Sequence, residues 1–304
     1  IKFEEYFNSK KDDLLMSRII ILGASGFIGF NLLNELKKQN FQIKAMIYKK
    51  KLHIKVPHFS GNILTPKSLD SILKKGDIVI NLTGQISKNP INFIQTNILG
   101  SINLLDSCYR KKVEKIIFLS SINVYGENNK SPSLETDSLK PFTTYAHVKI
   151  LTEEIYKSYA DIYDLNITIL RLSNIYGPNK KSGFIANLIN SLNDKKIKNI
   201  VNNNGNQYRD FLHIDDAITG IILAIKNRNN GLHLYNLSSG KRFSIKKIIE
   251  IIEKLSAKKV NAKFSNNTTD EKCIWANNSK ANKKLNFSPT VSLTDGLFLT
   301  IKNL

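Results

Sequence analysis

The stretch Ile20-Ile-Leu-Gly-Ala-Ser-Gly-Phe-Ile-Gly29 decides how the front of this chain folds. A run of branched aliphatic residues, typical of a buried strand, passes into three glycines spaced three apart, and a helical pattern begins at once. The unpaired N–H groups and positive dipole at such a helix start can hold a phosphate if no side chain intervenes. Gly23, Gly26 and Gly29 therefore predict a site for a dinucleotide diphosphate, with close helix–strand packing alone as the alternative.

The pattern that follows alternates strands with helices. Strands are expected at Ile19–Leu22, Gln42–Tyr48, Asp77–Leu82, Ile116–Ser120 and Ile167–Leu172, and helices at Phe27–Lys38, Pro66–Lys74, Ile91–Lys111 and Thr143–Tyr159. Short runs rich in branched side chains, without polar alternation and separated by helices, indicate a parallel sheet covered on both faces. The expected fold class is therefore α/β, with a doubly wound parallel sheet of the Rossmann type.

Three segments are expected along the chain. Residues 1–15 are polar and mixed in charge, and we interpret them as an N-terminal extension. Residues 16–173 would form the dinucleotide-binding domain. Beyond them the alternation loosens into turn-rich pieces and helices at Asp215–Lys226 and Ser244–Leu255. Residues 174–304 are therefore expected to form mainly a smaller substrate-binding domain, interleaved with the first because some segments return to it.

The composition excludes several classes of protein. The formal net charge is +20 over 304 residues. A basic surface can mark binding to nucleic acid, but lysine, asparagine and isoleucine are used throughout and the lysines stand in short, scattered runs, so we expect no specific nucleic-acid partner. No apolar run is long enough to cross a bilayer and no export leader is recognisable, so we expect no membrane insertion and a cytoplasmic location.

The two cysteines point to neither a disulfide nor a metal. Cys108 and Cys273 lie far apart and have no histidine at metal-ligand spacing. Free thiols and no metal site are therefore expected.

A tyrosine and a lysine open a predicted helix in Tyr145-Ala-His-Val-Lys149, one turn apart and on one face. A phenol has a pKa near 10 and is a poor base at neutral pH, but a neighbouring ammonium favours the phenolate. The pair predicts a general base, although the same spacing occurs on ordinary amphipathic helices.

The strand before that helix ends in two serines, within Ile116-Ile-Phe-Leu-Ser-Ser-Ile-Asn-Val-Tyr-Gly126. Ligands of doubly wound sheets bind at the carboxyl ends of the strands. A hydroxyl there can hold a substrate oxygen beside the tyrosine. Local capping of the turn is the alternative role for Ser120 and Ser121.

Several motifs together carry a resemblance to a known family. They are Gly23-x-x-Gly26-x-x-Gly29, Ser121-x-x-Val124-Tyr125-Gly126, Tyr145-x-x-x-Lys149, Arg171-x-x-Asn174-x-Tyr176-Gly177-Pro178, Arg209-Asp210-Phe211-x-His213 and the closing segment Trp275–Pro289. They occur in the family's order and cover the chain from Arg18 to about residue 300. The chain resembles the extended short-chain dehydrogenase/reductase family, and within it the NAD(P)-dependent nucleotide-sugar epimerase/dehydratase branch.

The resemblance implies a role for each matching position. It makes Ser121, Tyr145 and Lys149 the catalytic residues. It assigns cofactor binding to Gly23, Ser25, Gly26, Phe27, Ile28, Gly29, Tyr48, Lys49, Asn62, Ile63, Leu82, Thr83, Gly84, Asn97, Ser120, Tyr145, Lys149, Leu172 and Ser173. It assigns substrate binding to Gln85, Ser121, Asn123, Tyr145, Asn174 and Arg209, the last on a phosphate. We interpret His213 and Asp216 as structural, a helix start and its cap.

The second strand ends in Ile47-Tyr48-Lys49-Lys50-Lys51, without an acid. An acid at this place binds the ribose diol of NAD, whereas a basic residue accommodates the extra phosphate of NADP. The cofactor is therefore expected to be NAD or NADP, with a weak preference for NADP. A solvated turn is the alternative role of these lysines.

The chain departs from the family pattern at two places. Dehydratases of the branch usually carry Asp-Glu after the catalytic hydroxyl residue, and this chain has Ile122-Asn123. Dehydration is therefore disfavoured. A second phosphate-binding arginine is often found where this chain has Asn267, three residues before Asp270. The substrate assignment then depends on Arg209 and on scattered lysines.

These observations favour a nucleotide-sugar epimerase that acts at C4 through a 4-keto intermediate. One alternative is an NADPH-dependent reductase of 4-keto-sugar nucleotides that uses the same residues. Another is a non-catalytic family member that senses NADP or binds nucleic acid. The family's habit also implies a homodimer, with Ile91–Lys111 and Thr143–Tyr159 as the candidate interface helices.

Overall fold

A computed structural model describes residues 17–48, 51–52, 54–84, 90–127, 131–266 and 273–303. The chain divides into two compact units. The first contains the described residues of Ile1–Ser120, Thr143–Leu170 and Ile221–Leu234, and the second those of Ser121–Phe142, Arg171–Gly220 and Tyr235–Leu304. The expected N-terminal extension lies outside the described residues. The expected domain boundary at residue 173, with its functional labels, stays a prediction.

The central element is a seven-stranded sheet in the order β11-β6-β5-β4-β1-β2-β3. Its strands are β1 (Ile19–Leu22), β2 (Ile43–Ile47), β3 (His58–Ser60), β4 (Ile78–Asn81), β5 (Lys115–Ser121), β6 (Ile167–Leu172) and β11 (Leu232–Leu237). Strand β1 pairs in parallel with both β2 and β4, so the winding direction reverses there. The predicted doubly wound parallel sheet is confirmed. In such sheets ligands bind at this reversal, beyond the carboxyl ends of the strands.

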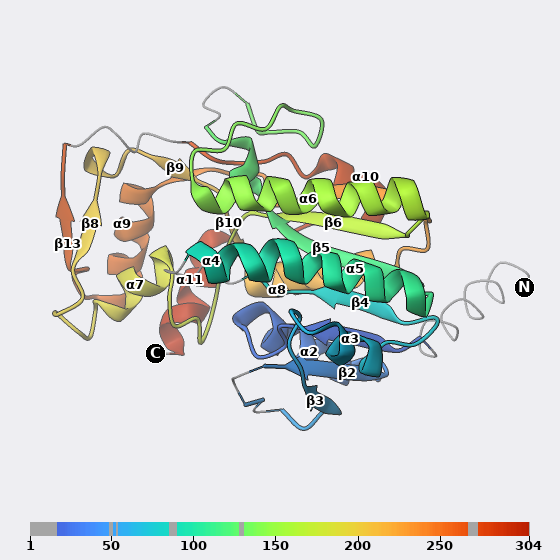
Figure 1. Ribbon diagram of the computed structural model, residues 1–304. Coiled ribbons are helices and arrows are strands. Elements are labelled where there is room, and N and C mark those ends of the chain that lie inside the picture. Colours follow the sequence, from blue (N-terminus) through green and yellow to red (C-terminus); the bar gives the residue numbers. More distant parts are fainter. Residues whose placement is uncertain are drawn as a thin grey trace, which may run out of the picture. The chain divides into compact units, whose positions relative to one another are not determined.

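The helices of the first unit are α2 (Phe27–Lys38), α3 (Pro66–Ile72), α4 (Pro90–Ile94), α5 (Gly100–Lys111) and α6 (Thr144–Tyr163). Helices α5 and α6 lie side by side (Figure 1). The expected helix over Ile91–Lys111 is present, and within it a π-helical turn, η1 (Gln95–Leu99), connects α4 to α5. Its extra residue turns Asn97 into the interior, where it is 2 % exposed. Such π-turns occur frequently at functional sites.

Each unit has its own apolar core. In the first, side chains of the strands meet those of the helices around Leu22, Leu104, Ile116 and Tyr156. In the second, α9 (Ile245–Ser256) contributes four buried isoleucines, one of them Ile248, to a cluster that also holds Leu188 and Leu297. The isoleucines recur at helical spacing, so one face of α9 is buried.

The second unit combines small sheets with helices. Strand β7 (Asn174–Tyr176) pairs in parallel with β10 (Phe211–His213), β9 (Tyr208–Arg209) pairs antiparallel with β12 (Phe243–Ser244), and β8 (Asn199–Val201) pairs in parallel with β13 (Ala262–Phe264). The helices besides α9 are α7 (Phe184–Asn190), α10 (Ser279–Leu285) and α11 (Leu293–Lys302), and α8 (Ile214–Lys226) begins here. Short 3₁₀ turns occupy Ile122–Tyr125 and Asn203–Gly205.

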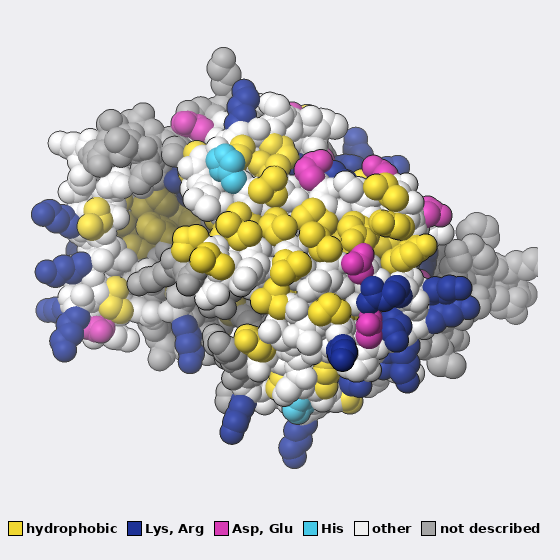
Figure 2. Space-filling view, viewed as in Figure 1, with side chains coloured by type: hydrophobic (Ala, Val, Ile, Leu, Met, Phe, Trp, Pro, Cys, Tyr) yellow, Lys and Arg dark blue, Asp and Glu magenta, His cyan; other side chains and the backbone are white. Residues whose placement is uncertain are grey.

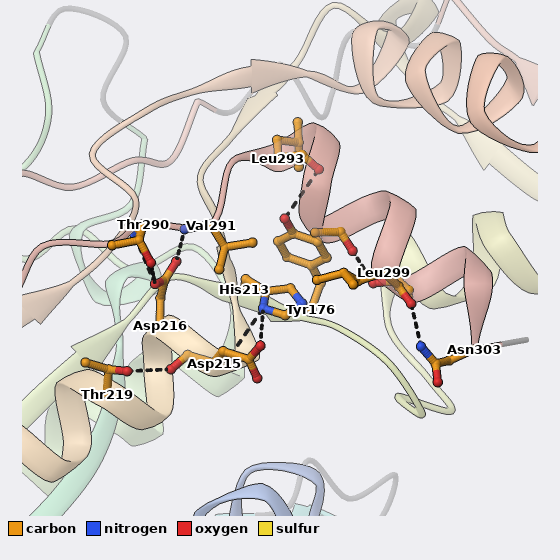
Figure 3. Close-up of polar contacts among 12 residues, drawn as sticks. Tyr176, His213, Asp215, Asp216, Thr219, Thr290, Val291, Leu293, Leu299 and Asn303 are labelled. Atoms are coloured by element: carbon orange, nitrogen blue, oxygen red, sulfur yellow. Dashed lines mark hydrogen bonds and ion pairs between the residues drawn. The ribbon is translucent and has the colours of Figure 1, made fainter.

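The start of α8 corrects one expectation (Figure 3). His213 precedes the helix, and its Nδ1 accepts the backbone N–H of Asp215 at 3.3 Å. Asp216, which we expected to be the cap, lies inside the first turn. Its carboxylate accepts the backbone N–H groups of Thr290 at 2.9 Å and Val291 at 3.0 Å. Asp216 therefore ties the approach to α11 onto α8 and does not cap the helix.

Within the described ranges, no helix is both long and apolar enough to cross a membrane. The same residues hold no cluster of side chains that could bind a metal ion. Both cysteines are buried and free.

Candidate active site

The glycine-rich turn lies between β1 and α2, where the sheet reverses its winding. Gly23 has φ +78°, and a Cβ there would lie 2.9 Å from the carbonyl carbon of Leu82 at the end of β4. A Cβ at Gly29 would lie 2.6 Å from the carbonyl oxygen of Gly23. The turn is therefore packed backbone against backbone, and side chains at either position would force it apart.

The amino end of α2 offers an anion a surface without side chains. Gly26 precedes the helix, is exposed and provides no side-chain cap, and the first turn of α2 contains no acidic residue. The exposed backbone of such a helix start attracts negative charge. The residues present thus fit the diphosphate of a dinucleotide.

The loop after β4 is shaped by a residue that the sequence did not single out. Asn81 is 1 % exposed. Its Oδ1 accepts the backbone N–H of Thr83 at 3.0 Å and the Thr83 hydroxyl at 2.5 Å, and its Nδ2 donates to the hydroxyl of Tyr156 at 2.8 Å. These bonds fix Leu82, Thr83 and Gly84 beside the glycine-rich turn. Gln85 lies outside the described residues.

Gly84 leaves room for two polar groups. A Cβ built on it would lie 2.9 Å from Nζ of Lys149 and 3.1 Å from Oδ1 of Asn97. Asn97 donates from Nδ2 to the carbonyl of Phe93 at 2.9 Å, and its buried Oδ1 has no hydrogen-bond partner among the described residues. A buried acceptor without a partner is costly, so Oδ1 is available to a donor from a bound ligand. This placement fits the cofactor-binding role predicted for Gly84 and Asn97.

Tyr145 stands in the first turn of α6, which Thr143 caps by accepting the N–H of Ala146 at 3.1 Å. Its ring is half-buried and stacks on Phe93, with centroids 6.3 Å apart. The ammonium of Lys149 lies 5.9 Å from the centroid of the Tyr145 ring. The predicted pairing of tyrosine and lysine on one helix face is therefore present.

Lys149 is held in a nearly dry place. It is 3 % exposed, donates to the carbonyl of Leu119 at 2.9 Å and lies 4.7 Å from the centroid of the Phe118 ring. Burial lowers the pKa of Lys149 to about 8, and the negative charge of Glu153 opposes that fall. With this pKa the lysine remains mostly charged at neutral pH.

Further predicted cofactor residues of the first unit follow strands β2 and β3. Tyr48 follows β2 and is 60 % exposed, while Lys49 lies outside the described residues. Asn62 follows β3, and its Oδ1 accepts the N–H of Leu64 at 3.0 Å. Ile63 is 4 % exposed. Their contacts with a cofactor stay predictions, as do those of Ser25, Phe27 and Ile28.

The two serines at the end of β5 differ in their surroundings. The hydroxyl of Ser120, in the first unit, donates to Oε1 of buried Glu153. Ser121 belongs to the second unit, where its Oγ accepts the N–H of Asn123 at 3.2 Å and caps the 3₁₀ turn. The capping role considered for Ser121 is thus present, and its catalytic role beside Tyr145 stays a prediction.

Two of the predicted substrate residues lie in the second unit, Asn174 on β7 and Arg209 on β9. Asn174 donates from Nδ2 to the carbonyl of Asp210 at 3.0 Å, directly after Arg209. Arg209 donates from Nη1 to the carbonyl of Tyr208 at 2.8 Å. Asn174 and Arg209 are therefore brought to one corner of this unit.

Two further cofactor candidates, Leu172 and Ser173, lie at the end of β6. Both are buried, and Ser173 donates its N–H to the carbonyl of Leu237 at 3.0 Å. Their contacts with a nicotinamide stay predictions.

A family model decides what kind of protein this site belongs to. The model described as the NAD dependent epimerase/dehydratase family matches residues 19–238. The chain belongs to that family. The sequence-based resemblance to this family is therefore confirmed.

Relatives within the epimerase/dehydratase family differ in their reactions. A UDP-glucuronate 4-epimerase of Thermodesulfobacterium geofontis is 34% identical over 220 residues, 70% of this chain and 66% of that protein. A dTDP-D-glucose 4,6-dehydratase of Dictyostelium discoideum is 31% identical over 280 residues, 80% of this chain and 64% of that protein. Related proteins of the family are thus NAD-dependent enzymes of nucleotide sugars.

A solved structure of the family shows the same architecture. The UDP-glucuronic acid 4-epimerase of Bacillus cereus, in complex with UDP-glucuronic acid and NAD, superposes with a TM-score of 0.82 at 28% identity. The match covers 94% of this chain and 98% of the other. That neighbour binds NAD, and the weak preference for NADP stays a prediction.

Proposed function

We propose that this chain is a nucleotide-sugar 4-epimerase that inverts the hydroxyl configuration at C4 of a UDP-sugar. The observation that carries the proposal is the pair of Tyr145 and Lys149 on α6, with the lysine held dry beside Gly84. The names of the relatives support C4 and a UDP-sugar, because one at 34% identity and one at 28% are both 4-epimerases.

Each residue of the pair has a distinct task. Tyr145, as phenolate, removes the proton of the sugar 4-hydroxyl and returns it after the keto sugar has presented its other face. Lys149 carries a positive charge near the phenol, which lowers the energy of the phenolate and so the pKa of Tyr145. Ser121 donates a hydrogen bond to the sugar oxygen. Bound nicotinamide dinucleotide supplies a hydride acceptor and donor for C4.

Dehydration is the reaction that this chain is least suited to. Elimination of water needs a general acid and a general base near the leaving hydroxyl. Ile122 and Asn123 stand where dehydratases carry acids; Ile122 is 1 % exposed, and the Asn123 backbone N–H is bonded to Ser121. Neither side chain is an acid or a base at neutral pH.

For the cofactor, we propose a nicotinamide dinucleotide bound at the turn of Gly23, Gly26 and Gly29. The NAD of the Bacillus cereus neighbour favours NAD, and the lysines after Tyr48 favour NADP. The purified protein is denatured and the mass of the released dinucleotide is measured by mass spectrometry. NADP is heavier than NAD by one phosphate group, so the mass identifies the cofactor.

The test of function needs no added reductant. Purified protein is incubated with UDP-glucuronate or UDP-glucose, and the C4 configuration is followed by proton NMR. An epimerase converts substrate catalytically without added NADPH. Loss of NADPH absorbance in step with consumption of a 4-keto-sugar nucleotide, with no epimerisation, would establish the reductase instead.

We also propose a homodimer formed through α4, α5 and α6. Large apolar side chains gather on this face of the first unit (Figure 2). Those at least 41% exposed are Ile91, Ile94, Leu99, Tyr109, Leu151, Ile162 and Tyr163. A contiguous apolar surface of this kind is unusual on a monomer. We call these seven residues the α4–α6 patch.

A further inference from the structure

A buried acid on α6 has no part in the mechanism so far. Glu153 is 0 % exposed and stands one helical turn beyond Lys149. Acids are almost never fully buried without compensating partners, because removal of a carboxylate from water is expensive. One such partner is Ser120, whose hydroxyl donates to Oε1 of Glu153.

Two consecutive residues of β5 are bound by two residues of α6. The ammonium of Lys149 donates to the carbonyl of Leu119 at 2.9 Å, and the Glu153 carboxylate accepts from the hydroxyl of Ser120. Lys149 and Glu153 are four residues apart, so both project from one face of the helix toward the strand end. The two bonds fix where along β5 the lysine head group sits.

We propose that Glu153 is a positioning residue for the reaction: its carboxylate, anchored by Ser120, holds the ammonium of Lys149 charged and in place against Leu119. The inference rests on the proposed function only in its expected effect on the rate of turnover. The placement of Lys149 by Glu153 can be measured without any sugar.

The electrostatic reasoning has a definite sign. Burial favours the neutral form of Lys149 and lowers its pKa, and the Glu153 charge works against that effect. Removing the carboxylate charge leaves burial unopposed, so the lysine loses its proton at lower pH. A neutral lysine no longer favours the Tyr145 phenolate. The titratable groups that the structure places against the ammonium are Tyr145 and Glu153, both on α6. The other groups that face the ammonium belong to β5, Gly84 and Asn97, and none of them is titratable.

The test compares Glu153→Gln with a neighbouring control. Glutamine keeps the size and can still accept from Ser120, but it carries no charge. Glu154→Gln removes an acid of the same helix whose side chain is 58% exposed and paired with Lys157 at 2.7 Å. Proteins labelled with ¹³C at lysine Cε are titrated by NMR in the presence of the nicotinamide dinucleotide and without sugar. The Lys149 signal is assigned by its absence from Lys149→Arg.

The proposal expects the Lys149 midpoint to fall by about one pH unit or more in Glu153→Gln and to stay in place in Glu154→Gln. Ser120→Ala keeps the charge and removes the anchor, so its midpoint is expected to move less than that of Glu153→Gln. In turnover, the ratio of wild-type to Glu153→Gln rates should grow about tenfold from below to well above the wild-type midpoint. A rate lowered equally at every pH, with an unmoved midpoint, would overturn the positioning role.

The outcomes also separate this inference from the proposed function. A shifted midpoint in a protein that epimerises no sugar nucleotide supports the role of Glu153 and refutes the function. Normal epimerisation with an unmoved midpoint does the reverse. If Glu153→Gln does not fold, Glu153→Asp withdraws the carboxylate by one methylene; a smaller fall of the midpoint supports the inference, and none overturns it.

Discussion

The ammonium of Lys149 lies 2.9 Å from the carbonyl oxygen of Leu119, inside the first unit and almost out of contact with water. A cation in such a place is stabilised by a dipole and opposed by burial. The protein keeps it there at a cost in stability, which is expected where a charge serves the chemistry of a site.

That cost predicts a pH dependence of unfolding in the protein without cofactor. The pKa of Lys149 is about 8 in the folded protein against 10.5 ordinarily. Between these values the unfolded chain binds more protons, so stability rises with pH. Relative to Lys149→Met, the free energy of unfolding of wild type should rise by about 3 kcal/mol from pH 8 to pH 10.5. Denaturant titrations of both proteins at several pH values measure the free energy of unfolding. Equal changes of this free energy with pH in wild type and Lys149→Met would contradict the prediction.

Tyr145→Phe should abolish most of the activity and leave the cofactor bound. The phenyl ring retains the stacking on Phe93 but has no hydroxyl to accept the substrate proton. Loss of a general base of this kind lowers the rate by about 10²–10⁴-fold. Turnover is measured by NMR and bound dinucleotide by mass spectrometry. Near-normal turnover would remove Tyr145 from its proposed role.

The fold could be predicted because its strands are short, apolar and without alternation, and because glycines mark the junction after β1. The π-turn at Asn97 could not, since one extra residue hardly disturbs the apolar pattern from Ile91 onward. Strand β3, with three residues, is too short to carry a pattern. Strand β11 is exposed at its start and buried only in its second half, and it follows a turn-rich region where strands were not expected.

The site residues could be predicted where the reaction needs a particular residue type at a particular spacing. They could not be predicted where the role depends on burial or on contacts distant in sequence. Tyr145 and Lys149 have a spacing that indicates their function. Glu153 looks in sequence like an ordinary acid of a solvated helix face, and only burial shows otherwise. Its spacing of four from Lys149 was the one available signal. Asp216 was misplaced because its partners, Thr290 and Val291, are more than seventy residues away.

Gly23→Ala should be far more harmful than Gly76→Ala. Both glycines have a left-handed backbone, with φ of +78° and +80°, so both substitutions carry a strain of about 1–2 kcal/mol. The added methyl would meet the Leu82 backbone at 2.9 Å in the first case and nothing within 4 Å in the second. Thermal unfolding and dinucleotide retention measure the difference, and equal effects would argue against the close packing of the turn.

Asp216→Ala should destabilise the protein by about 1–3 kcal/mol, because the charged carboxylate of Asp216 accepts hydrogen bonds from two backbone N–H groups, those of Thr290 and Val291. Asp215→Ala is the control on the adjacent residue. The side chain of Asp215 is 68% exposed, and its Oδ2 lies 3.4 Å from Nδ1 of His213. Its loss should change the free energy of unfolding by about 0.5 kcal/mol or less. A comparable loss in both variants in denaturant unfolding would show that Asp216 does not anchor Thr290 and Val291.

Ile162→Lys should dissociate the proposed dimer, whereas Ile200→Lys should not. The two isoleucines are equally exposed, at 71% and 72%, but Ile162 belongs to the α4–α6 patch and Ile200 to β8 of the second unit. A lysine buried in an apolar interface must lose its hydration without gaining a partner, and in a symmetric dimer it does so on both subunits. Light scattering after size exclusion gives the mass of each variant. A wild-type mass of 34.5 kDa, the mass of one chain, would contradict the dimer outright. Dissociation by Ile200→Lys alone would place the interface elsewhere.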